Sequence, residues 1–219
     1  MDQSDQSSGR VLLVNKPLEW TSFDVVNKLR YKLKTKKIGH AGTLDPLATG
    51  LLILCTGKMT KRIDEYQAQE KEYTGTFTLG QTTPSYDLET EPTPASDIRH
   101  LSDDMIIKAA QGFLGMIKQV PPVHSAIRVG GKRAYEYARA GQPLQLKERE
   151  VEIKEFEITN IEKPLVHFRV VCSKGTYIRS LAHDFGKALG VGAYLSSLCR
   201  TRIGEFKLED ALTVDQIEP

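Results

Sequence analysis

The sequence predicts an α+β (mixed α/β) fold in which a central, mostly antiparallel mixed β-sheet is flanked by helices. Strand-like and helix-like segments alternate irregularly along the 219 residues, without a repeat and without the regular strand-helix-strand rhythm of a parallel sheet. A chain of this length with 40% hydrophobic residues can bury a sizeable core. We therefore expect a single domain at residues 10–219, after a polar, serine-rich, disordered tail at residues 1–9.

Buried apolar runs and capping signals predict the first elements. Residues 11–14 are expected to form a short buried strand. Thr21 or Ser22 can cap a helix whose apolar residues recur at helical spacing. Residues 51–54 are predicted as a second buried strand, and residues 72–79 as a third with alternate side chains on one face.

The second half of the sequence opens with residues 80–101, which are rich in Thr, Pro, Asp and Glu and are expected to form an acidic surface loop. Thr213 and Gln216 resemble a capping box, which predicts a short terminal helix. Helices are also predicted at residues 103–114, 132–139 and 177–189, and antiparallel strands at residues 151–159 and 165–172.

Several classes of protein do not fit this composition. An apolar run of about 18 residues and a charged-then-apolar leader are both absent, which predicts a cytoplasmic protein without a membrane partner. Cys55, Cys172 and Cys199 are scattered, so we expect reduced core thiols and no metal site. A nucleotide cofactor is not expected, because the glycine-rich residues 39–51 match neither a P-loop nor Gly-x-Gly-x-x-Gly.

The most informative stretch, residues 39–51, holds one carboxylate, Asp45, in a loop without other acids. Pro46 disfavours helical backbone at the preceding residue, and the glycines permit close approach of a substrate. An Asp beside Pro and Gly most commonly stabilises a turn. The pattern alone therefore leaves two interpretations open, a structural turn and a catalytic carboxylate.

A basic tract leads into this loop. It can be an ordinary solvated helix face followed by a turn. Its position beside the Asp45 loop also suits a phosphate backbone that passes over the site, with Lys32, Lys34 and Lys36 as candidate contacts. The tract contains Lys28, Arg30, Lys32, Lys34, Lys36 and Lys37 and no acid.

Arg179 is expected in the first turn of a helix, where the positive end of the helix dipole opposes its charge. The side chain can bend back into water, which needs no partner. Alternatively it pairs with Asp45 and grips that carboxylate in a fixed orientation.

Five separated motifs, taken in order, resemble a bacterial TruB-type tRNA pseudouridine synthase. The resemblance spans nearly the whole chain, and several motifs in the right order are far more specific than one alone. The motifs are Lys16-Pro17, Gly39 to Pro46, Tyr73, residues 121–126 (Pro-Pro-Val-His-Ser-Ala) with residues 131–139 (Gly-Lys-Arg-Ala-Tyr-Glu-Tyr-Ala-Arg), and Ser173 to Arg179.

The resemblance implies a pseudouridine synthase fold with RNA-contacting loops. The implied reaction is isomerisation of uridine 55 in the tRNA T-loop to pseudouridine by base flipping, without cofactor or metal, by a protein expected to be a monomer that binds the T-arm stem-loop. Asp45 would be the nucleophile, Tyr73 would stack on the target base, and Arg179 would pair with Asp45. The substrate-binding residues implied are His40, which helps to extract the base, with Lys16, Gly42, Tyr177 and Leu198.

The residue types agree with this chemistry. Uracil must leave its ribose, turn, and rejoin through carbon, so one ionised carboxylate either attacks the sugar or starts an elimination from it. A glycosidase normally uses two carboxyl groups. A stacked base cannot be reached, so it must flip out, and a ring such as that of Tyr73 gives it a surface on which to rest.

The sequence departs from the family pattern at three places. One is Arg128, which stands where Lys is common and conserves the charge but not the donor geometry. Glu19 and Trp20 stand where the family usually has Gly before Thr-Ser. Many members continue into an RNA-binding PUA domain, whereas this sequence ends at Pro219, so we expect a short form, natural or truncated, in which the basic tract carries more of the contact with RNA. Two alternatives stay open: a catalytic subunit that depends on a guide RNA, and a tRNA-folding chaperone or RNA-binding module.

Overall fold

The computed structural model describes residues 9–219, which divide into two compact units. The first unit combines the described residues up to Thr74 with Ser197–Pro219, and the second is Gly75–Ser196. The single domain expected at residues 10–219 stays a prediction, and each unit is described by itself. The tail expected at residues 1–9 lies, except for Gly9, outside the described residues.

The first unit contains a mixed sheet. Strands β1 and β3 are antiparallel, with Leu12 opposite Leu54, whereas β10 and β3 are parallel, with Leu198 opposite Ala48. The strand order is β12 (Leu212–Thr213), β1 (Val11–Lys16), β3 (Ala48–Thr56) and β10 (Ala193–Ile203, which extends from the second unit), with β2 (Ile38–His40) on β3 and β11 (Phe206–Lys207) on β10.

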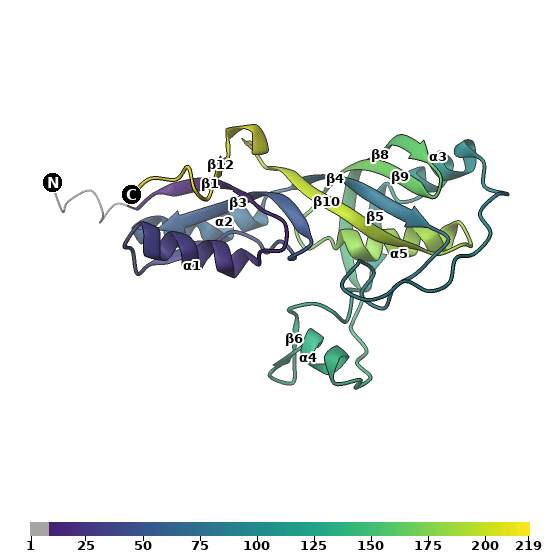
Figure 1. The fold of residues 1–219 in the computed structure, drawn as a ribbon, viewed down its shortest axis with the longest axis horizontal. Helices are drawn as coiled ribbons and strands as arrows, with labels where there is room; N and C mark the ends of the chain where they lie inside the picture. The colour runs from purple at the N-terminus through teal and green to yellow at the C-terminus, as the bar shows by residue number, and fades with distance from the viewer. Residues whose placement is uncertain (1–8) are drawn as a thin grey trace. The chain divides into compact units, whose positions relative to one another are not determined.

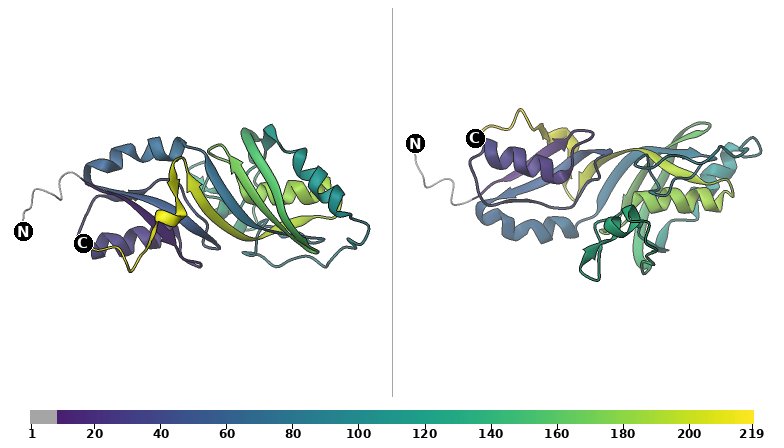
Figure 2. Two further views of the ribbon diagram at one scale, coloured as in Figure 1. Left: turned by 90° about the horizontal axis from the view of Figure 1, so that it is seen from above. Right: turned by 60° about the horizontal axis from the view of Figure 1, so that its bottom comes forward.

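Helices cover both faces of this sheet, as Figure 2 shows. Leu52 and Leu54 of β3 belong to a core with α1 (Ser22–Lys32). The alternate residues Leu51 and Ile53 pack instead with α2 (Ile63–Ala68), which follows the 3-10 helix η2 (Gly57–Arg62). Both faces of β3 are therefore buried, which explains the continuous apolar run that predicted this strand.

Helix α1 begins and ends with well-formed caps. The Thr21 hydroxyl accepts from the Asp24 amide, and the Asp24 carboxylate accepts from the Thr21 amide, which confirms the predicted N-cap. At the other end the Lys34 amide donates to Tyr31 O (3.2 Å) and the Thr35 amide to Arg30 O (3.1 Å). This is a Schellman motif, whose left-handed position is occupied by Lys34 (φ 49°), where glycine is usual.

The turn before α1 contains a second left-handed residue, Glu19 (φ 65°), whose amide donates to Pro46 O (2.8 Å). This is the position where the family pattern has glycine. The left-handed conformation destabilises an L-residue by about 1–2 kcal/mol. Glycine avoids this strain, but it loses more conformational entropy on folding, which offsets part of the gain in stability.

We expect Glu19→Gly to raise the free energy of unfolding by about 0.5–1 kcal/mol. Urea unfolding measures it, with Glu19→Ala as the control, because alanine keeps the left-handed strain. Equal stabilities of the two variants would contradict this interpretation.

The second unit carries the other sheet strands, in the order β4 (Lys71–Leu79, which begins in the first unit), β9 (Leu165–Cys172), β8 (Arg149–Glu162) and β5 (Gly115–Gln119). The pairs β8–β9 and β5–β8 are antiparallel. Its two longer helices are α3 (Asp103–Gln111) and α5 (Ile178–Ala188). Five phenylalanines, at positions 77, 113, 156, 168 and 185, form its aromatic core.

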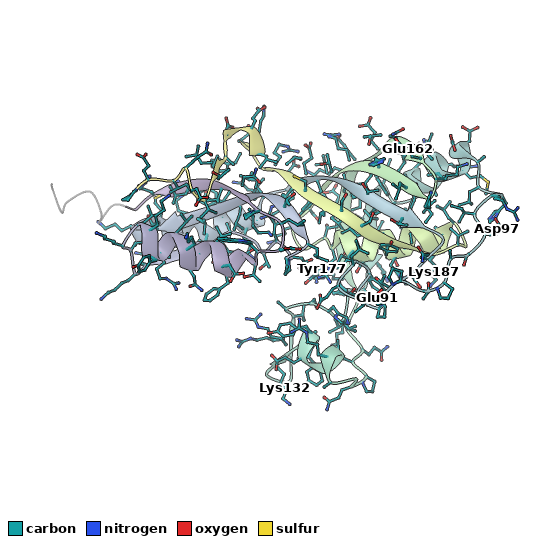
Figure 3. The ribbon with its side chains drawn as sticks, in the orientation of Figure 1. Glu91, Asp97, Lys132, Glu162, Tyr177 and Lys187 are labelled. Atoms are coloured by element: carbon teal, nitrogen blue, oxygen red, sulfur yellow. The ribbon has the colours of Figure 1, made fainter. Side chains whose placement is uncertain are left out.

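A small hairpin-and-helix segment of this unit contains β6 (Arg128–Val129), β7 (Lys132–Arg133) and α4 (Ala134–Arg139) (Figure 1; Lys132 is labelled in Figure 3).

The predicted mixed α/β architecture, with a largely antiparallel sheet flanked by helices, is confirmed. Within the described residues, none of the helices is long and apolar enough to span a membrane. The three cysteines are free thiols, of which Cys199 is partly exposed.

Several local predictions were wrong or incomplete. The helix expected at residues 103–114 ends at Gln111 and is followed by β5, and the one expected at residues 132–139 begins two residues later, after β7. No strand was predicted at β10, nor at the shorter strands β2, β5, β6, β7, β11 and β12. In place of a terminal helix, β12 and a turn follow the 3-10 helix η3 (Leu208–Asp210).

Candidate active site

Asp45 lies in the loop at residues 41–47, which joins β2 to β3. The two strands pair as an antiparallel hairpin, with His40 opposite Leu54. Asp45 is half-buried, between buried Leu44 and exposed Pro46. The strands thus present a single carboxylate on a loop at the end of a paired hairpin.

Every backbone carbonyl from Gly42 to Pro46 accepts a hydrogen bond. Arg200, which is 1% exposed, donates to Gly42 O (3.2 Å) and Thr43 O (3.4 Å). Ser22 Oγ bonds both Leu44 O (3.1 Å) and the Leu44 amide (2.8 Å). The Ala48 amide donates to Asp45 O (3.0 Å), and the Glu19 amide to Pro46 O. This network fixes the backbone that carries Asp45, as a site for precise chemistry requires.

Two glycines, Gly42 in the loop and Gly50 in β3, allow the backbone to pack against Arg200. Gly42 has φ 100° and Gly50 has φ 104°, conformations that L side chains rarely adopt. A Cβ at Gly50 would also lie 2.4 Å from Arg200 O. Gly42, predicted at the substrate, thus has a structural reason to be glycine.

Lys16 supports the loop through hydrogen bonds to main-chain carbonyls. It is fully buried, and its Nζ donates to the carbonyl oxygens of Pro17, Trp20 and Pro46. Burial lowers its pKa from 10.5 to about 8, although the charge of Asp45 opposes this shift. The structure thus places the predicted residue Lys16 in electrostatic contact with Asp45.

This lowered pKa makes stability depend on pH. Between about pH 8 and 10.5 the unfolded chain binds more protons at Lys16 than the folded protein, so the free energy of unfolding gains up to about 1.4 kcal/mol per pH unit from this residue. Below pH 8 both states are protonated and the gain disappears. In urea unfolding from pH 7 to 10, the free energy of unfolding of wild type should rise relative to that of Lys16→Met as the pH rises. A difference between the two proteins that stays constant with pH would contradict the prediction.

His40 ends β2 just before the loop. Burial lowers the pKa of its imidazole, and the positive charge of Arg200 lowers it further. Burial and the charge of Arg200 thus both favour the neutral form of the ring. Its Nδ1 is buried without a hydrogen-bond partner.

Two further predicted residues belong to the first unit. Leu198 is half-buried and pairs in β10 opposite Ala48, which directly follows the Asp45 loop. Tyr73 is buried in β4, with 8% of its surface exposed. The register thus places Leu198 beside the loop, as a supporting role would require.

Arg179 lies in the first turn of α5 and is 4% exposed, so it does not bend back into water. Its Nη1 donates to His124 O (2.9 Å) and Ser85 O (3.3 Å), and lies 3.5 Å from Asp87 Oδ2. These contacts are within the second unit, whereas Asp45 belongs to the first. The pairing of Arg179 with Asp45 stays a prediction.

Asp87 is a residue that sequence reasoning missed. It lies in the segment predicted as an acidic surface loop, yet it is buried with Thr83 and Ser85. Hydrogen bonds within the segment stabilise its conformation: Thr83 Oγ1 donates to Asp87 O (2.7 Å), and Asp87 Oδ1 accepts from the Glu89 amide (2.9 Å). The alternation of small hydroxyl residues with Asp87 was the signal that an acidic composition concealed.

Tyr177 directly precedes α5 and is labelled in Figure 3. Its backbone forms a reciprocal pair of hydrogen bonds with the Gln119 side chain (2.8 and 3.0 Å). The Arg149 guanidinium lies 4.7 Å from the centre of its ring. Backbone and ring are thus both anchored within the second unit.

The predicted phosphate contacts differ in their surroundings. Lys32 Nζ donates to Asp215 O (2.6 Å) and Val214 O (3.4 Å), whereas Lys34 and Lys36 are exposed.

In the described part of the chain, no three His, Cys, Asp or Glu side chains come together as a possible metal site.

Two relatives resemble the whole chain. A protein of Flavobacterium johnsoniae called tRNA pseudouridine synthase B is 53% identical over 100% of this chain and 98% of its own length. A protein of the same name from Parabacteroides distasonis is 53% identical over 98% of this chain and 94% of its own length.

A solved structure of a Cbf5-Nop10-Gar1 complex contains a similar chain, with 33% identity and a TM-score of 0.75 over 97% of this chain. The present chain covers 55% of that chain, or about half its length. Family models for the "TruB family pseudouridylate synthase (N terminal domain)" and the "tRNA pseudouridylate synthase B C-terminal domain" match residues 30–178 and 179–219. The chain therefore belongs to the TruB family of pseudouridylate synthases, with the pseudouridine synthase fold that the resemblance implied.

Proposed function

We propose that this protein isomerises uridine 55 in the T-loop of tRNA to pseudouridine, with Asp45 as the catalytic nucleophile. The observation that carries the proposal is the Asp45 loop, whose carbonyls from Gly42 to Pro46 are all hydrogen bonded. A carboxylate on so fixed a backbone keeps its orientation toward a bound sugar. The names of the 53% identical relatives support tRNA as the substrate.

In the proposed reaction the bond between ribose C1′ and uracil N1 breaks, and a bond between C1′ and C5 forms. C5 loses a proton and N1 gains one, so neither water nor a redox partner is consumed. The ionised Asp45 carboxylate either attacks the sugar or starts an elimination from it. One carboxylate is sufficient for this chemistry.

The other residues prepare the substrate. Tyr73 stacks on the flipped base, and Arg179 grips Asp45. A neutral His40 can replace the extracted base in the stack without placing an unpaired charge there. The proposed binding pocket for the target uridine is shaped by four further residues, Lys16, Gly42, Leu198 and Tyr177.

The test is a tritium-release assay. The purified protein is incubated in EDTA with a T-arm stem-loop that carries tritium at C5 of the target uridine, and released tritium is counted. We expect one release per RNA, and none from a stem-loop with cytidine at that position. Activity only after addition of a guide RNA and partner proteins would contradict the proposal in favour of a guide-dependent subunit.

We further infer that the protein acts in the cytoplasm as a monomer, with backbone contacts from Lys32, Lys34 and Lys36. Size-exclusion chromatography with light scattering checks the monomer. Elution as a stable dimer under assay conditions would contradict it.

A further inference from the structure

A surface pocket lies at the C-terminal end of α1. None of the residues proposed to act on the target uridine lines it, but its lining includes the three lysines proposed to contact the RNA backbone. Its volume is about 670 Å³, within the range of small-ligand sites. It is lined by Asn27, Arg30, Tyr31, Lys32, Lys34, Thr35 and Lys36. The pocket and the Asp45 loop both belong to the first unit.

The charge of the lining selects an anion. It contains four basic side chains and no carboxylate. Lys32 donates to the carbonyls of Val214 and Asp215, whereas Lys34 and Lys36 are exposed and can contact a ligand. Such a concentration of lysines favours phosphate.

The ring of Tyr31 narrows the choice of anion. It is 89% exposed, the highest exposure among the large hydrophobic residues of the described chain. A free phosphate would use the lysines and leave the ring in water, whereas a nucleotide uses both. Nucleic acid bases stack on exposed aromatic rings while nearby cations hold their phosphates.

Helix α1 links the pocket to the Asp45 loop. Ser22, at its start, bonds Leu44 of that loop, and the pocket lies at its other end. The axial rise of an α-helix makes this separation about 15 Å. Phe23, 59% exposed, precedes Tyr31 by about two turns of α1, and the Arg30 guanidinium lies 6.0 Å from its ring centre. An RNA bound at Asp45 can therefore follow aromatic and basic side chains of α1 to the pocket.

The backbone at the pocket gives a further indication. Lys34 occupies the left-handed position of the α1 C-cap, where glycine avoids strain. Retaining lysine there places a cation in the lining of the pocket. Local strain of this kind gathers at binding sites.

We propose that this pocket binds an unpaired nucleotide of the RNA substrate, with its base stacked on Tyr31 and its phosphate held by Lys34 and Lys36. The inference rests on the proposed function, because it takes RNA as the substrate. It adds a contact about one helix length away from the reacting uridine.

The experiment measures binding of a fluorescein-labelled, unmodified tRNA transcript by anisotropy. Tyr31→Ala should raise Kd about 5- to 100-fold, the usual effect of losing one base stack. Tyr31→Phe keeps the ring and should stay within about twofold of wild type. Met105→Ala, at an exposed apolar residue of α3, is the matched surface control and should bind like wild type.

A second readout places the nucleotide directly. RNA containing 4-thiouridine at unpaired positions is crosslinked to the protein, and mass spectrometry maps the adduct, which we expect on the peptide that contains Tyr31. Wild-type affinity in Tyr31→Ala, or crosslinks only elsewhere, overturns the pocket proposal even if wild type releases tritium. Absence of tritium release from wild type, with the Tyr31 effect present, overturns the proposed reaction and leaves the RNA pocket standing.

Discussion

Asp45→Asn should reduce the rate of pseudouridine formation by at least about 10³-fold and leave tRNA binding nearly unchanged. Asparagine has the shape of aspartate but cannot supply the negative charge that attacks the sugar or starts the elimination. The hydrogen bonds that hold the loop use main-chain carbonyls, so the substitution leaves them in place. Single-turnover tritium release measures the rate, and anisotropy measures binding.

The control is Asp64→Asn, at an exposed carboxylate of α2 in the same unit. It changes the net charge equally, so its rate should remain at the wild-type value. If Asp45→Asn also converts uridine at the wild-type rate, Asp45 is not the nucleophile and the loop has a structural role only.

Asp87→Ala should lower the free energy of unfolding by about 3–5 kcal/mol. The substitution removes a carboxylate that is 7% exposed from a guanidinium that is 4% exposed. It also removes the acceptor of the Glu89 amide, so the turn of the loop loses a second interaction. Urea unfolding followed by circular dichroism measures the change.

Glu89→Ala separates this effect from a general sensitivity of the loop. Glu89 pairs with Arg139 at 3.1 Å, but its side chain is 38% exposed and that of Arg139 is 67% exposed. A solvated pair of this kind contributes about 0–1 kcal/mol. Similar losses in the two variants would show that burial of the Asp87 carboxylate is unimportant.

Local physics explains which elements could be predicted from the sequence. Helix α1 has its cap, its first-turn acid and its buried stripe within a single segment. Thr21 and Asp24 therefore indicate the helix without knowledge of the rest of the fold. Strand β3 is buried on both faces and is therefore apolar throughout. Asp45 could be selected as a candidate because proline and glycine mark its loop locally.

The missed features depend on contacts between distant segments. Strand β10 has no clean alternation, and its Arg200 is buried because it bonds carbonyls of the Asp45 loop, more than 140 residues earlier in the sequence. At the terminal segment, Thr213 and Gln216 do form the capping bond (2.9 Å). The helix is still not made, because Leu212 pairs with Val14 of β1 and Ile217 is buried in the core. Tertiary pairing outweighs the local signal at both places.

The division of the first unit between two distant stretches of sequence bears on how the protein is made. A chain emerging from the ribosome displays Asp45 early, but Arg200, which holds the carbonyls of Gly42 and Thr43, is synthesised close to the end. The second unit is continuous in sequence and can fold before that moment. The Asp45 loop is thus among the last parts of the molecule to reach its final structure, and a nascent polypeptide interrupted before Ser197 lacks the Arg200 anchor of that loop.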